Sequence, residues 1–266
     1  MNSNDRRYEG PLPFGRTSIT ASEARELVDL EGAYECAREG SVIEPHRVEQ
    51  FVESYPELFD WLEQNGRDYP WRNTSDPWEV YTAEILLQRT RGDAVEEVYP
   101  EFLDRFPDPA SLHAAPEEQI RETVYSLGFV NHRVRSLTEA AEIFCSEYSG
   151  TVPDDLEELK RPWRVGDYSA RACQIFSRGD TLALVDTNFA RVISRVLGYE
   201  MPPQPHKSEE VYKLMQTLIP DDPALARSFN LAILDLGALI CTSSSPECSV
   251  CPINHCCNYF HRIYRG

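Results

Sequence analysis

Residues 241–257 read CTSSSPECSVCPINHCC, and they constrain the structure more than any other stretch of the chain. Four cysteines in it have the spacing C-x6-C-x2-C-x5-C: Cys241, Cys248, Cys251 and Cys257. Four thiols in so short a segment indicate a metal site, because soft sulfur ligands select iron–sulfur clusters or zinc. The site would directly follow a helical run, FNLAILDLGALI. Cys256 falls outside the spacing and is interpreted as a spectator.

The composition is that of an ordinary globular protein. The chain has 266 residues, of which 41% are hydrophobic, enough for one large domain or two small ones. No apolar run approaches the roughly 20 residues of a membrane helix, and the N-terminus, MNSNDRRYEG, lacks the apolar segment of a secretory signal. We therefore expect a cytoplasmic protein without membrane contact, whose cysteines are metal ligands or buried thiols rather than disulfides.

The charge balance argues at first against a polyanionic partner. The net charge is −18, from 26 basic and 44 acidic residues. One interpretation is a solvated acidic surface, and the other is adaptation to a salt-rich cytoplasm. We favour the second, because at about 1 M salt the Debye length is only about 3 Å. Local contacts and helix N-termini would then carry the binding of an anion.

Helical signals dominate the chain from Val48 onward. Asp76-Pro77 is an N-cap followed by a first-turn proline. The segment EEQIRETVYSLG places its apolar residues on one face and ends at Gly128, a left-handed cap. The segment NFARVISRVLG has apolar residues at helical spacing. These patterns predict an all-α bundle in two lobes.

The chain divides into three predicted parts. Residues 1–45 form an N-terminal extension of unknown role, with a short helix around Glu23–Glu31. Residues 46–240 form the helical core, and residues 241–266 form the metal-binding loop and tail. The middle of the chain would form one lobe, and the N-terminal helices with the cysteine-rich end would form the other.

Residues 161–198, RPWRVGDYSARACQIFSRGDTLALVDTNFARVISRVLG, resemble the helix–hairpin–helix and Gly/Pro…Asp segment of the HhH-GPD DNA glycosylases. The cysteine spacing resembles the loop of the endonuclease III and MutY branch of that family, which implies a [4Fe–4S] cluster. The family hairpin, L-P-G-V-G-x-x-[ST]-A, is matched at Val165, Gly166, Ser169 and Ala170. Pro162, Trp163 and Arg164 replace its leucine, proline and first glycine.

The resemblance implies that the hairpin at Arg164, Val165 and Gly166 binds DNA. Such a hairpin offers backbone N–H groups to a phosphate, and glycine permits the close approach. The arginine leaves two alternatives open. Arg164 could supply a charged phosphate contact in place of the glycine, or the hairpin could be distorted.

Asp186 matches the family's catalytic aspartate. It follows the apolar run LALV and lies at or next to the N-cap of the next helix, where free N–H groups and the helix dipole favour the ionised carboxylate. Cleavage of an N-glycosidic bond builds positive charge on the sugar, and a fixed anion stabilises that charge. A simple helix cap is the alternative, and the neighbouring motifs favour catalysis.

Tyr168 bears on the type of reaction. In the bifunctional members of the family this hairpin position is a lysine that forms a Schiff base with the sugar and nicks the strand, and tyrosine cannot form that imine. The resemblance therefore implies a monofunctional enzyme. A tyrosine here is similar to the archaeal thymine–guanine mismatch glycosylases, whereas MutY enzymes usually have serine. Packing on the hairpin is an equally weighted alternative.

Glu84 lies in an apolar helical stripe within VYTAEILLQRT. A carboxyl group there should have a raised pKa, as suits a general acid, although a buried ion pair is an alternative. Gln88 matches the residue that the family inserts where the base was, and Arg89 would contact a phosphate or the opposite strand. The turn at Gly128, with Arg133 nearby, resembles the family's second DNA-facing turn.

The leading hypothesis is a monofunctional glycosylase of base excision repair, acting as a monomer on double-stranded DNA with a mismatched base. Extruding a base costs least at a mismatch, and we expect thymine or uracil opposite guanine as the substrate. Glu84 and Asp186 would face each other across a groove between the lobes. A MutY-type adenine glycosylase is the alternative, although such enzymes commonly carry a further C-terminal domain and this sequence ends at Gly266. A catalytically inactive iron–sulfur DNA-binding protein is the third hypothesis.

Overall fold

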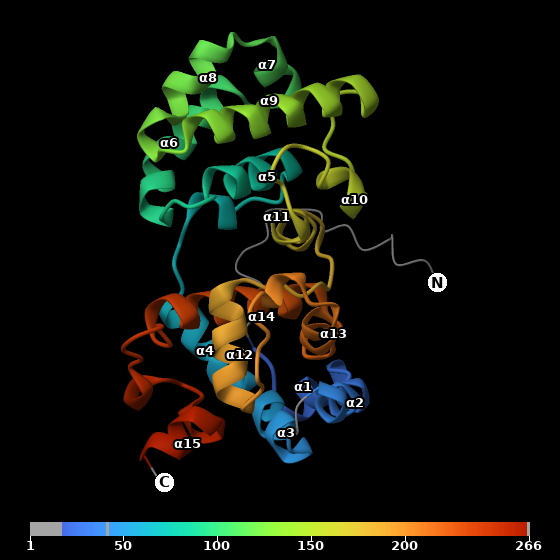
Figure 1. The fold of residues 1–266 in the computed structure, drawn as a ribbon, viewed down its shortest axis with the longest axis vertical. Coiled ribbons are helices and arrows are strands. Elements are labelled where there is room, and N and C mark those ends of the chain that lie inside the picture. Colours follow the sequence, from blue (N-terminus) through green and yellow to red (C-terminus); the bar gives the residue numbers. More distant parts are fainter. Residues whose placement is uncertain (1–17, 41–42, 265–266) are drawn as a thin grey trace. The chain divides into compact units, whose positions relative to one another are not determined.

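The computed structural model describes residues 18–40 and 43–264, and none of these residues lies in a β-strand (Figure 1). The predicted all-helical architecture is confirmed. Residues 1–17, which belong to the predicted N-terminal extension, lie outside the described residues. The chain forms two compact units. The described part of unit 1 is residues 68–179, and that of unit 2 is residues 18–67 and 180–264.

Unit 1 contains eight α-helices or short helical turns around α5, together with a π-helical turn. In chain order its elements are η2 (Pro70–Arg72), α5 (Pro77–Leu86), α6 (Gly92–Arg105), α7 (Pro109–Ala114), α8 (Glu117–Val124), η3 (Tyr125–Leu127), α9 (Val130–Glu147), α10 (Leu156–Leu159), α11 (Asp167–Cys173) and η4 (Gln174–Arg178).

The core of unit 1 is built on α5. Eight of the ten residues of α5 are buried, as expected for a helix that is apolar on every side. The long helix α9 packs on α5, α7 and α8 (Figure 1). Buried polar groups find partners: the Tyr81 hydroxyl donates to the carbonyl of Leu159 at 2.9 Å, and the Trp78 indole N–H donates to that of Phe106 at 2.9 Å. These contacts tie α5 to the segments that follow α6 and end α10.

Unit 2 joins the N-terminal helices to the C-terminal third of the chain. Its elements are α1 (Ala21–Leu27), α2 (Leu30–Gly40), α3 (Pro45–Glu53), α4 (Tyr55–Asn65), α12 (Thr187–Leu197), η5 (Pro205–Lys207), α13 (Glu209–Thr217), α14 (Pro223–Leu239), η6 (Cys248–Val250), η7 (Asn254–Cys256) and α15 (Asn258–Tyr264).

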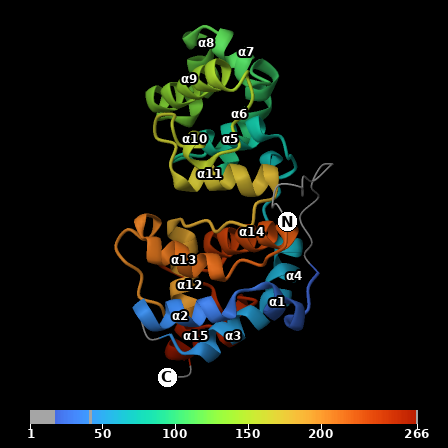
Figure 2. The same ribbon diagram turned by 90° about the vertical axis from the view of Figure 1, so that its right-hand side faces the viewer.

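The centre of unit 2 is α14, which packs on α4 and α12, while α2 lies beside α13 and α3 beside α12 (Figure 2). Fourteen of the seventeen residues of α14 are buried. One of them is Asp235, whose side chain is 0% exposed and forms an ion pair with Arg67 at 2.6 Å. Among the described residues no helix is long and apolar enough to cross a bilayer.

The predicted helix ends agree with the structure, with one difference in extent. The Asp76 side chain caps α5 through the N–H groups of Trp78 and Glu79, and Gly128 has φ 67°. The single short helix expected around Glu23–Glu31 is wrong, because α1 and α2 are separated there. The Asp29 side chain accepts a hydrogen bond from the N–H of Gly32 at 3.0 Å, which starts a new helix.

Candidate functional site

The C-terminal end of α5 carries three of the predicted site residues. Glu84 is 7% exposed among the apolar side chains of α5. Gln88 is half-buried and donates from Nε2 to the carbonyl of Arg164 at 3.2 Å. Arg89 is exposed and has a positive φ of 55°. The end of α5 therefore contacts the predicted hairpin directly.

The hairpin between α10 and α11 keeps its turn despite its altered sequence. Arg164 adopts φ 57°, the left-handed conformation that glycine adopts without strain. The N–H of Val165 closes the turn on the carbonyl of Pro162 at 3.1 Å, and the Val165 side chain is buried. Gly166 is exposed at the N-cap of α11. Of the two alternatives, the backbone turn is therefore retained, and an arginine side chain is displayed on it.

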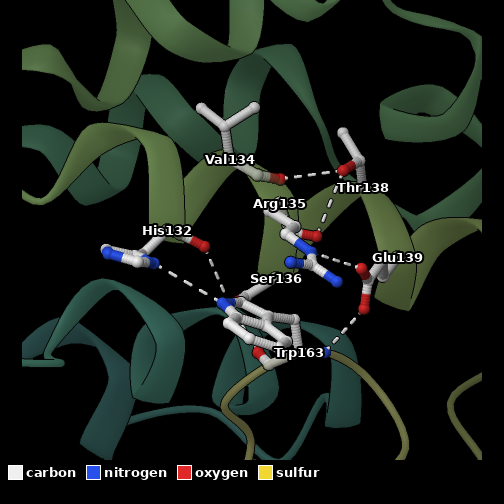
Figure 3. Close-up of polar contacts among 7 residues, drawn as sticks. All are labelled: His132, Val134, Arg135, Ser136, Thr138, Glu139 and Trp163. Atoms are coloured by element: carbon white, nitrogen blue, oxygen red, sulfur yellow. Dashed lines mark hydrogen bonds and ion pairs between the residues drawn. The ribbon is translucent and has the colours of Figure 1, made fainter.

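Helix α9 holds the first half of this hairpin (Figure 3). The Trp163 N–H donates to Glu139 Oε2 at 2.8 Å, and the Ser136 hydroxyl donates to the Trp163 carbonyl at 2.6 Å. These two contacts satisfy the backbone on both sides of the indole. They anchor the backbone of Trp163, the residue at the position of the family's proline, to α9.

Arg133 joins the two loops that carry Gln88 and Gly128. Its Nη2 donates to the carbonyls of Leu86 and Gln88, each at 3.0 Å, and its Nη1 donates to the carbonyl of Gly128. Arg133 is 2% exposed, and burial lowers its pKa to about 10. The Arg133 side chain therefore links the backbone of the two turns, and whether the turn at Gly128 faces DNA stays a prediction.

Phe129 lies where these turns meet. It is 39% exposed and has φ 53°. The guanidinium carbon of Arg89 lies 4.9 Å from the centre of its ring, and that of Arg164 lies 5.6 Å from it. Both distances are in the range of cation–π contacts. Unit 1 therefore brings the segments of Gln88, Arg89, Gly128 and Arg164 together, and their contact with DNA stays a prediction.

Asp186 caps α12 in unit 2. Its Oδ1 accepts from the N–H of Phe189 at 2.6 Å. Burial raises the pKa of the Asp186 carboxyl above its ordinary value, against the opposing effect of the N–H groups of Phe189 and Asn188. The expectation that the helix end favours the ionised form is therefore outweighed by burial, which disfavours a charge more than two hydrogen bonds stabilise it.

Two arginines on α12 connect the Asp186 end of the helix to the cysteine-rich loop. Arg191 donates from Nη2 to Asn188 Oδ1 at 2.8 Å and from Nε to the carbonyl of Cys241 at 2.8 Å. Arg195 donates from Nη1 to Cys241 Sγ at 3.3 Å and to the carbonyl of Thr242 at 2.7 Å. Sequence reasoning missed both, although their i, i+4 spacing on the polar face of an amphipathic helix was a visible signal.

The four predicted metal ligands line one cavity, together with apolar side chains of α12, α14 and the tail. The cavity includes Cys241, Cys248, Cys251, Cys257, Val192, Val196, Leu236, Ile240 and Ile253. Burial raises the pKa of the Cys251 thiol to about 12. The Cys256 thiol instead contacts the Ile253 carbonyl at 3.3 Å and the Ser54 hydroxyl at 3.6 Å. The spectator interpretation of Cys256 fits these contacts.

The predicted catalytic residues divide between the units. Glu84 and Tyr168 belong to unit 1, where Tyr168 lies half-buried in the first turn of α11. Asp186 belongs to unit 2. Their arrangement across a groove stays a prediction.

Comparisons with known proteins show which family this chain is similar to. Residues 82–220 match the family model described as HhH-GPD superfamily base excision DNA repair protein. A thymine-DNA glycosylase from Aeropyrum pernix is 37% identical over 206 residues, which cover 77% of this chain and 92% of the relative. A thymine/uracil-DNA glycosylase from Pyrobaculum aerophilum is 36% identical, covering 78% and 92%.

The chain is also similar to a solved structure and to an adenine DNA glycosylase. The structure of a thermostable thymine-DNA glycosylase superposes with a TM-score of 0.74 at 30% identity, covering 82% of this chain and 98% of the other. An adenine DNA glycosylase from Mycolicibacterium smegmatis is 32% identical, covering 75% of this chain and 67% of the relative.

Proposed function

Because this chain belongs to the HhH-GPD superfamily of base excision DNA repair proteins, we propose that it is a monofunctional glycosylase that removes thymine or uracil opposite guanine. The similarity to two archaeal glycosylases named for thymine, at 37% and 36% identity, supports this substrate. The observation that carries the chemistry is Asp186, a half-buried carboxyl held at the start of α12.

Asp186 is proposed to stabilise the sugar as the base leaves. When the N-glycosidic bond breaks, its electron pair goes to the base and the sugar gains positive charge. The Phe189 N–H holds Oδ1 at 2.6 Å, which fixes the orientation of the carboxylate before the reaction. A preoriented anion in a partly dry site stabilises that charge more strongly than a mobile one in water. It is also suited to orient the attacking water.

Tyr168 supports hydrolysis without strand cleavage. Its phenol has no amine with which to form an imine on the sugar, so water is the expected nucleophile. The expected products are the free base and an intact strand with an abasic site.

Glu84 is proposed as the acid that protonates the departing base. It is 7% exposed in α5, whose C-terminal end leads directly into the turn that carries Gln88. A buried carboxyl group placed next to the predicted DNA-contacting turn is of the type that serves as a general acid.

The four cysteines are proposed to hold a [4Fe–4S] cluster. They line a common cavity with apolar side chains, and four thiolates in one short segment are a ligand set that such a cluster takes. When bound, the cluster would cross-link the segment after α14, at Cys241, to the start of α15, at Cys257.

Base release from a panel of duplexes tests the function. Labelled duplexes with T·G, U·G, A·G and A·8-oxoguanine pairs are incubated with the protein, and each sample is divided between alkali and buffer. We expect strand breaks from T·G and U·G in the alkali-treated halves alone. Breaks without alkali would contradict the monofunctional assignment, and release of adenine alone would reassign the substrate. If no base is released from any duplex, the proposed glycosylase activity is wrong.

A further inference from the structure

The hairpin tryptophan and an arginine of α9 form an exposed pair that lies outside the predicted DNA contacts. The guanidinium carbon of Arg135 lies 3.8 Å from the centre of the Trp163 ring, close enough for a strong cation–π contact (Figure 3). Trp163 is 37% exposed, and the Arg135 side chain is 54% exposed.

The pair continues the surface formed by the turns at Phe129 and the hairpin. Trp163 Nε1 lies 3.5 Å from His132 Nδ1, and the His132 ring lies 4.8 Å from the Phe129 ring. The Phe129 ring in turn contacts the guanidinium groups of Arg89 and Arg164. Three aromatic side chains with arginines at both ends therefore form one connected set of contacts on unit 1. We call this set the arginine–aromatic stripe: Arg89, Arg164, Phe129, His132, Trp163 and Arg135.

The chemistry of the pair suits the sugar–phosphate backbone of DNA. A guanidinium group offers two parallel N–H donors to a phosphate, and an aromatic side chain packs on sugars and bases. The Trp163 N–H is already donated to Glu139, so that amide is occupied within the protein. We propose that Arg135 and Trp163 form an additional DNA contact beside the hairpin, in which the guanidinium binds a phosphate and the indole packs on the adjoining deoxyribose. This inference rests on the proposed function only in taking DNA as the ligand.

A substitution of Glu139 should change DNA affinity in the opposite direction to a substitution of Arg135. Its Oε1 accepts from Arg135 Nε at 2.7 Å, and its Oε2 accepts from the Trp163 N–H at 2.8 Å. The carboxylate orients both groups, but it also neutralises the charge that a phosphate would meet. Glu139→Gln keeps an acceptor oxygen for Trp163 and removes the negative charge. If DNA binds here, this change strengthens binding, whereas an ion pair that served folding alone would produce no gain.

The experiment measures equilibrium binding of the full chain to a fluorescent duplex, with and without a T·G pair, across a range of salt concentrations. Arg135→Gln should weaken binding by about threefold to tenfold and reduce the slope of log K against log salt by about 0.9, the value for one phosphate contact. Trp163→Ala should weaken binding, Trp163→Phe should weaken it less, and Glu139→Gln should strengthen it.

A second ion pair of unit 1 provides the matched control. Arg105 and Glu101 are also four residues apart on a helix, 3.0 Å from each other, with side chains 45% and 59% exposed. Arg105→Gln and Glu101→Gln change the net charge by the same amounts and should leave affinity and salt slope unchanged. Equal effects at both pairs would reduce the result to net charge and overturn the inference.

Binding and base release are measured on the same variants, so the two proposals fail separately. If Arg135→Gln and Trp163→Ala bind DNA as the wild type does, the pair is a packing element or a contact for a protein, and the inference is wrong even where base release proceeds. If the wild type binds duplexes but releases no base, the proposed function is wrong while the contact between Arg135 and DNA is still decided by the salt slopes.

Discussion

The turns of unit 1 and the start of α12 in unit 2 hold their proposed functional groups against different unfavourable terms, backbone strain in unit 1 and burial of a charge in unit 2. Arg89, Phe129 and Arg164 are three of the four non-glycine residues with positive φ in the described part of the chain, and they meet at one ring. Left-handed backbone costs about 1 kcal/mol or more at each such residue. Asp186 has an ordinary backbone, but burial disfavours its charge.

In each unit the proposed functional groups lower the stability of the fold. In unit 1 the exposed arginines lie on strained left-handed backbone, and in unit 2 the Asp186 carboxylate is partly removed from water. Substitutions that relieve either cost should therefore preserve or raise stability while they impair function. Groups that only support the fold should lose stability and function together.

The largest effect is expected at the proposed cluster site of unit 2. Cys251→Ser should remove iron, abolish base release and make residues 180–264 sensitive to protease, because a ligand that closes the cavity is lost. Iron analysis, visible absorption and limited proteolysis check this. Cys256→Ala is the control, since the Cys256 thiol points to Ser54 and Ile253, and it should keep its iron. Full iron in Cys251→Ser would exclude Cys251 as a ligand.

The next effect compares two glycines of unit 1. A Cβ added at Gly166 would meet nothing within 4 Å, and the backbone there is extended with φ −111°. Gly166→Ala should therefore leave Tm unchanged or slightly higher and weaken DNA binding by about tenfold, or about 1.4 kcal/mol, because the methyl group occupies the approach of a phosphate.

Gly128→Ala should behave differently. Its site is also open, but φ is 67°, so alanine is strained and the free energy of unfolding should fall by about 1 kcal/mol. Thermal melts and duplex binding on both variants separate strain from steric exclusion. Wild-type affinity in Gly166→Ala would show that no ligand approaches this N-cap.

A smaller effect is expected from restoring glycine in the hairpin. Arg164→Gly relieves the left-handed strain at φ 57° and loses the cation–π contact with Phe129, so the free energy of unfolding should stay the same or rise by up to about 1 kcal/mol. DNA affinity should fall by about fivefold, with a salt slope lower by about 0.9. A variant that melts lower but binds DNA normally would show that Arg164 supports folding.

The smallest effect concerns pH. Burial raises the pKa of Asp186, so base release should fall as pH drops through a value above that of an ordinary aspartate, because the protonated acid cannot stabilise a cation. The sign for stability is opposite: a raised pKa in the folded state adds stability as pH falls through it. Single-turnover rates and melts across pH check both. A rate that stays flat down to an ordinary aspartate pKa would contradict the raised value.

Local patterns predicted the parts of the site that depend on neighbouring residues. The caps at Asp76 and Asp186 and the left-handed Gly128 follow from short sequence signals, and the structure has all three. The cysteines were identified by spacing alone, and they line one cavity. Each of these features is decided within at most 17 residues of chain, the span from Cys241 to Cys257.

Features that depend on long-range packing could not be predicted. Arg133 looks like a surface arginine in sequence, yet it binds carbonyls 45 and 47 residues away. The direction in which the Asp186 pKa shifts is set by burial of the carboxyl, which no local pattern contains. The Arg135–Trp163 pair joins α9 to a hairpin 28 residues later, across a turn whose shape depends on both.

The most direct test of the account is the single-turnover rate of thymine release from a T·G duplex by Asp186→Asn relative to wild type. Asparagine keeps an oxygen to cap α12 and removes the charge. We predict a loss of about 1,000-fold or more, with Tm and duplex binding unchanged or higher. A variant that releases thymine at the wild-type rate would remove Asp186 from the reaction and contradict the account.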